Sequence, residues 1–85
     1  MTFLFWLLTQ TEREDQIGDL ARDAERIVRN PKLWRGSIPE SWRTDDPTPD
    51  METFGCFEDE RGLELALDEF ASALEEEAAD EGKIK

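Results

Sequence analysis

The spacing of apolar residues between positions 16 and 29 constrains the fold more than any other feature of the sequence. These residues recur three and four positions apart, as on one face of an α-helix. They are Ile17, Leu20, Ala21, Ala24, Ile27 and Val28. Asn30-Pro31 follows the pattern, and a residue before proline is disfavoured in the helical conformation. We therefore expect an amphipathic helix over residues 16–29.

A second helical pattern covers residues 59–79. Its apolar face consists of Leu63, Ala66, Leu67, Phe70, Ala73 and Leu74. Residues 3–8 are apolar throughout and fit either a short helix or a buried strand, because so short a run cannot settle the period. Residues 51–57 fit one more helical turn. The sum predicts an all-α fold: a small bundle of four to five short helices over residues 1–76, with an acidic tail at 77–85 that frays.

The segment between the two amphipathic helices is the hardest to interpret, since residues 31–50 contain all four prolines. We expect a short helical turn around residues 32–34 and an irregular chain after it. Trp34, Ile38 and Trp42 are the side chains expected to hold this segment to the core.

The first 31 residues carry a family resemblance. Phe5-Trp6-Leu7-Leu8 is followed, after a polar gap, by Ile17-Gly18-Asp19-Leu20-Ala21-Arg22-Asp23 and then by Pro31. This order resembles the YozE-like family of small bacterial proteins, whose fold is similar to that of sterile alpha motif (SAM) domains. The Pro-rich middle departs from the family pattern. The resemblance implies a compact SAM-like bundle and, by analogy with SAM domains, a protein-interaction module; it implies no enzymatic activity.

Gly18 lies in the first turn of the expected helix 16–29. Glycine in a helix interior costs about 1 kcal/mol relative to alanine. We expect it at this position because another helix packs closely there, and Trp6 is the neighbour that we favour.

Charge is distributed unevenly along the chain, whose formal net charge is −12. Residues 1–42 hold seven acids and six bases, whereas residues 43–85 hold fifteen acids and four bases. Nucleic acids and anionic membranes both attract Lys and Arg, so this balance argues against both as partners. Two explanations stay open: a docking surface for a basic protein, or simply the solubility of an acidic chain.

The residues that usually carry chemistry are scarce. The chain has no histidine, the commonest general base and metal ligand, and its single cysteine, Cys56, cannot form an internal disulfide. We expect Cys56 to be a half-buried thiol. The carboxylates that are candidate cation ligands lack the spacing of a calcium loop; they are Asp45, Asp46, Asp50, Glu52, Glu58, Asp59 and Glu60. We therefore expect no enzyme, cofactor, metal or small-molecule substrate.

The longest apolar run, residues 3–8, is too short for a membrane span or a secretory signal. Together with the lone cysteine, this predicts a cytoplasmic protein.

The candidate interaction residues form two charged groups and a pair of tryptophans. The basic stripe lies on and after helix 16–29: Arg22, Arg26, Arg29 and Arg35. The acidic group lies on the closing helix: Glu64, Asp68 and Glu69. The basic stripe is either an ion-paired solvated face or a docking face for an acidic surface, such as that of a second copy. Trp34 and Trp42 either cap the core or, if exposed, anchor an interface.

Two functions are compatible with these observations. The first is a non-enzymatic protein-interaction module that works by SAM-like self-association or as an adaptor. The second is an acidic inhibitor or nucleic-acid mimic that binds a basic protein, as phage-borne and antitoxin-like proteins can. Carboxylates spaced like phosphates on the folded surface would favour the second.

Overall fold

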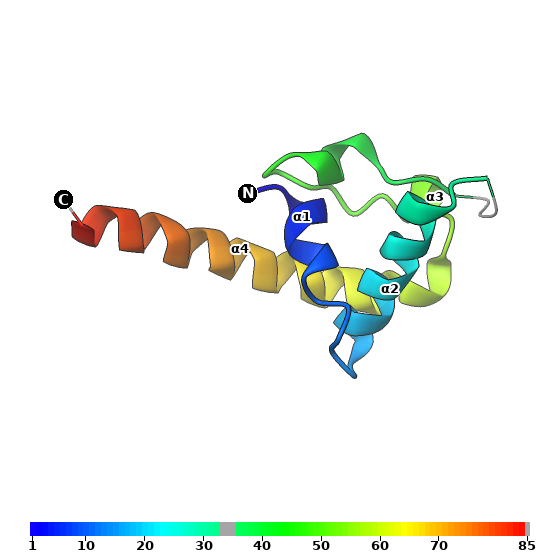
Figure 1. Cartoon of the computed structure of the whole chain (residues 1–85), viewed down its shortest axis with the longest axis horizontal. Helices are drawn as coiled ribbons and strands as arrows, with labels where there is room; N and C mark the ends of the chain where they lie inside the picture. The colour runs from blue at the N-terminus through cyan, green and yellow to red at the C-terminus, as the bar shows by residue number, and fades with distance from the viewer. Residues whose placement is uncertain (33–35, 85) are drawn as a thin grey trace.

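The computed structural model describes residues 1–32 and 36–84, and the side chains of residues 1–32 and 36–77. This part of the chain forms four α-helices and two short 3₁₀-helices and contains no strand (Figure 1). The elements in order are α1 (Phe3–Leu8), α2 (Gln16–Arg29), η1 (Glu40–Arg43), α3 (Met51–Phe54), η2 (Phe57–Asp59) and α4 (Glu60–Ile84). The predicted all-α class is confirmed, and residues 3–8 are a helix rather than a strand.

Side-chain caps explain where two of the helices begin. The Asp15 carboxylate accepts a hydrogen bond of 3.0 Å from the Gly18 amide at the start of α2. The Asp50 carboxylate accepts one of 3.0 Å from the Thr53 amide at the start of α3. Each of these bonds satisfies an amide that has no partner within its helix. Helix α3 ends at Gly55, whose φ of 80° is the left-handed conformation that glycine adopts without strain.

The core is built around a chain of aromatic rings. Phe3 lies 5.3 Å from Trp42 and 5.3 Å from Phe70, measured between ring centroids, and it contacts both rings edge to face. Trp42 in turn lies 4.9 Å from Phe54. Such aromatic pairs contribute roughly 0.5–1.5 kcal/mol beyond the area that they bury. The rings join α1, η1, α3 and α4 into one core.

Several apolar side chains lie further out than the sequence pattern suggests. Phe5 is 65% exposed, so α1 is not buried on all sides, and Val28 at the end of α2 is 45% exposed. Leu67 and Leu74 of α4 are only partly buried. A helix covered by its neighbours on one side buries the centre of its apolar stripe, and the edges of the stripe stay accessible.

The segment from Gly36 to the end of η1 also packs against the core. Ile38 is 8% exposed and Trp42 is fully buried, as expected for the side chains that hold this segment. Gly36 passes so close to the Phe54 carbonyl that an added Cβ would lie 1.7 Å from its oxygen. The helical turn expected around residues 32–34 falls mostly outside the described residues.

Helix α4 organises the molecule because it packs against both α1 and α2. An added Cβ at Gly62 would lie 2.6 Å from the Gln16 carbonyl oxygen, which shows how closely the first turn of α4 meets α2. The C-terminal half of α4 then projects away from the other helices (Figure 1) and gives the molecule its length of 47 Å against widths of 25 and 20 Å. Helix α4 extends past the expected end at residue 79, and fraying of residues 77–85 stays a prediction.

Candidate functional site

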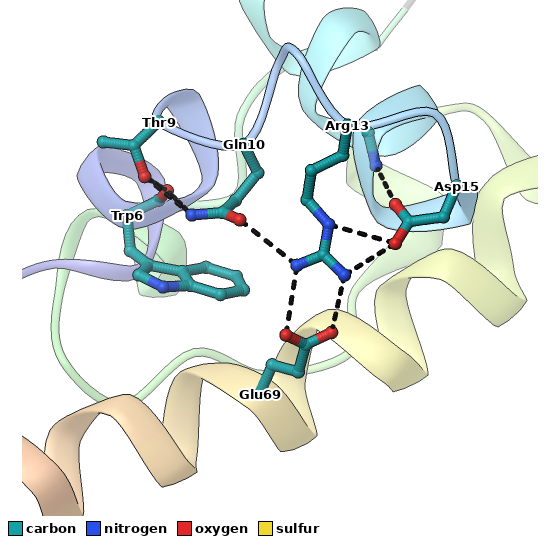
Figure 2. Close-up of polar contacts among 7 residues, drawn as sticks. Trp6, Thr9, Gln10, Arg13, Asp15 and Glu69 are labelled. Carbon is teal, nitrogen blue, oxygen red and sulfur yellow. Dashed lines mark hydrogen bonds and ion pairs between the residues drawn. The ribbon is translucent and has the colours of Figure 1, made fainter.

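An arginine in the loop between α1 and α2 holds the acidic helix α4 in place (Figure 2). The Arg13 guanidinium donates two hydrogen bonds to the Glu69 carboxylate, of 3.0 and 3.1 Å. It also donates to Asp15, at 3.0 and 2.6 Å, and to the side-chain oxygen of Gln10 at 3.2 Å. Hydrogen bonding to Glu69 and Asp15 raises the pKa of Arg13, and hydrogen bonding to Arg13 lowers the pKa of Asp15. We call this group the Arg13 clamp.

The clamp changes the interpretation of Glu69. The sequence suggested that Glu69 is available to a partner, but its two carboxylate oxygens are both engaged by Arg13 within the molecule. The two-pronged geometry matches the fork of a guanidinium to the two oxygens of a carboxylate, which is the strongest form of such a pair. Glu69 therefore has a structural role in this fold.

The basic stripe on α2 is largely engaged as well. Arg22 donates to the backbone carbonyls of Thr11 and Arg13, at 2.9 and 2.7 Å, and pairs with Asp19. It thereby fixes the α1–α2 loop to α2. The other two arginines of the stripe pair along their own helix, Arg26 with Asp23 at 3.2 Å and Arg29 with Glu25 at 3.8 Å. This arrangement supports the ion-paired alternative for the stripe.

The predicted tryptophan anchors divide between the core and the part of the chain that is not described. Trp42 is fully buried, and its indole N–H donates a 2.8 Å hydrogen bond to the Thr48 carbonyl. Of the two alternatives for Trp42, burial in the core is confirmed and the interface anchor is wrong, because a ring enclosed by Phe3 and Phe54 offers no surface to a partner. Trp34 and Arg35 lie outside the described residues.

The remaining members of the acidic group lie on the exposed side of α4. Glu64 and Asp68 are exposed and lie four residues apart, so they share a side of the helix. Glu75, Glu76 and Glu77 continue the exposed charge into the projecting half. Among the described side chains of α4, Glu69 is the carboxylate with an ion-pair partner.

A polar cluster that the sequence analysis missed lies between α2 and η2. One carboxylate oxygen of Asp23, one of Asp59 and the thiol sulfur of Cys56 all lie within 4.8 Å of one another. The thiol donates to Asp23 Oδ2 at 3.7 Å. Atom Oδ2 of Asp59 is buried and has no hydrogen-bond partner among the described residues. We call these three side chains the α2–η2 cluster.

Burial and like charge make the α2–η2 cluster hold protons. Burial, followed by the neighbouring Asp23 carboxylate, raises the pKa of Asp59 to about 7. Burial, followed by the carboxylates of Asp59 and Asp23, raises the pKa of the Cys56 thiol to about 12. The start of α4 favours a negative charge by about 0.3–1 kcal/mol. Two carboxylates about 4–5 Å apart near a protein surface repel by a few kcal/mol, roughly, so the repulsion is the larger effect.

This cluster is better suited to protons than to a metal ion. A bound metal requires deprotonated ligands, whereas the pKa of the Cys56 thiol is raised to about 12 and that of the Asp59 carboxyl to about 7, so a metal ion would have to displace protons. The carboxylates between Asp45 and Glu52 do not converge on a common point in the described structure. Asp50 instead caps α3, and hydrogen bonding to Thr53 lowers its pKa.

A small pocket of about 210 Å³ lies beside the α2–η2 cluster. It is lined by Gln16, Asp19, Glu58, Asp59, Arg61 and Gly62. Its lining is polar and carries charges of both signs, which differs from the apolar lining typical of small-molecule sites.

The chain was compared with protein-family models, with curated proteins and with solved structures, and none of them matches. The YozE-like and SAM-like resemblance therefore stays a prediction. Among the described residues, no helix has both the length and the apolar character that crossing a membrane requires.

Proposed function

We propose that this chain is a non-enzymatic protein-interaction module whose docking surface is the acidic outer side of α4. The observation that carries the proposal is the projection of α4 beyond the bundle (Figure 1), together with the exposed carboxylates along its described part. A helix that stands out from its bundle is accessible to a partner, and its negative charge selects for a basic surface. The packing of α1 and α2 against the first half of α4 holds this helix in position.

The chemistry of the single thiol supports a function without catalysis. A thiol whose pKa is raised to about 12 is almost wholly protonated at neutral pH, and the thiolate is the reactive form. The sequence supplies no histidine to remove the proton. We place the module in the cytoplasm, where a lone thiol stays reduced. Nucleic acids and anionic membranes are not proposed as partners, because carboxylates repel their phosphates.

A second copy is the first partner to test. The side chains of Arg26 and Arg29 are 65% and 73% exposed although each has an intrahelical carboxylate partner. Exposed ion pairs of this kind are worth about 0–1 kcal/mol, so their exchange for pairs with the α4 helix of another copy costs little. Such a contact joins two different surfaces and would build chains rather than closed dimers.

The test is the mass in solution, measured by light scattering after size exclusion over a series of protein and salt concentrations. We expect the mass to exceed that of a monomer at low salt and to fall to it at high salt, where charges separated by more than about 3 Å are screened at 1 M. Arg26→Glu and Asp68→Arg should each reduce association, and the double variant should restore it. Arg43→Glu, which changes an exposed arginine on η1, is the matched control.

A monomer under every condition would exclude a second copy as the partner. The acidic side of α4 is then tested with a Lys-rich peptide as a defined basic probe. Removing two charges from α4 with Glu64→Gln and Asp68→Asn should weaken binding more than removing two from the η1–α3 connection with Asp45→Asn and Asp46→Asn. Equal weakening by the two pairs would mean that only net charge matters, and the proposal would be wrong.

Nucleic-acid mimicry is the less favoured alternative. Carboxylates four residues apart on a helix, such as Glu64 and Asp68, are separated by about 6 Å along the axis. The phosphates of one DNA strand follow each other at about 3.4 Å along the duplex axis. The charge on this side of α4 is therefore sparser than that of a duplex.

A further inference from the structure

We propose that Asp23 and Asp59 share a proton across the junction between α2 and η2, and that this proton makes the junction a pH-sensitive latch. The proposal does not depend on the identity of any partner. It rests on three positions that the fold brings together: Asp23 on α2, Cys56 before η2, and Asp59 at the end of η2.

The buried oxygen of Asp59 is the first reason to place a proton there. Its Oδ2 is removed from solvent and has no hydrogen-bond donor among the described residues. A charged carboxylate oxygen in such a position loses the solvation of water and gains nothing in return. When protonated, the Asp59 carboxyl can instead donate a hydrogen bond to the Asp23 carboxylate, and a repulsion becomes an attraction.

The charged groups on the elements packed around Asp59 also raise its pKa on balance. On α2, Asp23 pairs with Arg26 through its other oxygen, and Asp19 adds a further negative charge that raises the pKa of Asp59. The nearby Cys56 thiol has the opposite effect and lowers the pKa of Asp59. Arg61 on α4 and Glu58 on η2 line the adjoining pocket with opposite charges. Burial and the two α2 carboxylates outweigh the opposing contributions, and the pKa of Asp59 is raised to about 7.

The sign of the pH dependence follows from this shift. In the unfolded chain Asp59 titrates near 3.8, and in the folded chain near 7. Between these values the folded state binds more protons, so the contribution of the latch to stability falls as pH rises through this interval. The stabilisation is fully present below pH 3.8 and absent well above pH 7. We expect η2 and the first turn of α4 to be held less firmly to α2 at pH 8 than at pH 5.5.

The decisive experiment is an NMR titration of the side-chain carboxyl carbons in the full chain. It starts at pH 5 rather than lower, because the isoelectric point is about 4.2. One resonance, assigned to Asp59 by its loss in Asp59→Asn, should titrate with a midpoint near 7. Asp23→Asn should move this midpoint down by at least one pH unit, because it removes the like charge. If every aspartate is already ionised at pH 5, the proposal is overturned.

A stability measurement provides an independent test. The amide of Asp59→Asn resembles the protonated carboxyl and does not titrate. The melting temperature of this variant relative to wild type should therefore rise between pH 5.5 and pH 8. Asp45→Asn removes an equal charge from an exposed position, and its difference from wild type should stay constant over that range. Parallel behaviour of the two variants would contradict the latch. Should Asp59→Asn fail to fold, the test is whether the wild-type chain has a carboxyl resonance with a midpoint near 7 and whether Asp23→Asn lowers that midpoint.

Discussion

Gly18 shows how a single residue can be required by its neighbour's backbone. A Cβ at this position would lie 2.0 Å from the carbonyl oxygen of Arg13. The close approach predicted for this glycine is present, but its neighbour is the α1–α2 loop and not Trp6 or another helix. The same carbonyl accepts a hydrogen bond from Arg22 and therefore has little freedom to move aside.

This geometry predicts that Gly18→Ala destabilises the protein. Helix propensity alone favours alanine by about 1 kcal/mol. The clash involves backbone atoms, and overpacking of this kind typically costs about 1–3 kcal/mol, so we expect a net loss. Urea unfolding followed by circular dichroism measures it. The control is Ser72→Ala at an exposed position of α4, where the propensity gain should appear without a clash. A stabilised Gly18→Ala variant would show that the loop can relax.

At the scale of elements, the Arg13 clamp ties the α1–α2 loop to α4 across a separation of 56 residues in sequence. The Arg13 side chain is 31% exposed and the Glu69 side chain 48% exposed, so water screens the pair in part. We therefore expect the clamp to contribute much less to the free energy of folding than the buried aromatic core does.

A double-mutant cycle measures this contribution. We expect Arg13→Ala and Glu69→Ala each to lower stability, with a coupling energy of about 0.5–1 kcal/mol that decreases in high salt. Denaturant unfolding of the four proteins at low and high salt provides the values. The control is a second cycle that combines Arg13→Ala with Asp68→Ala, and its coupling energy should be near zero. Equal coupling in both cycles would mean that only general electrostatics operates.

The sequence predicted elements better than the contacts between them. The bounds of α2 were predicted as 16–29 from the apolar spacing and from Asn30-Pro31, and the structure adds the Asp15 cap at the start of the helix. The burial of Phe70 followed from helical periodicity in the same way. The α2–η2 cluster was not predicted, since Cys56 and Asp23 are 33 residues apart and no local pattern joins them.

At the scale of the whole molecule, α4 extends well beyond the buried side chains that are described on it. Among the described side chains of α4, residues 60–77, Phe70 is the last fully buried one, and Ala73 and Leu74 pack partly against the core. The helix continues to Ile84. The buried side chains described on α4 therefore lie in its first half, before the helix projects from the bundle.

We therefore predict that a chain ending at Glu76 keeps its fold. The melting temperature should stay within a few degrees of the full-length value, since no buried side chain among the described residues is removed. Any salt-dependent association should change little, because the deletion removes three acids and two lysines and so only one net negative charge. Thermal unfolding and light scattering on the same samples test both expectations. A large fall in melting temperature would show that residues 77–85 stabilise the bundle.

The aromatic chain in the core also has an optical consequence. Trp6, Phe3, Trp42 and Phe54 form successive ring contacts inside the bundle. Their fixed, asymmetric environment gives near-ultraviolet circular dichroism, which vanishes when tertiary packing loosens, while the far-ultraviolet signal follows helix content. The molecule thus reports packing and helicity through separate spectral windows. A loosened core and a shortened α4 can be told apart in a single cuvette, without any label.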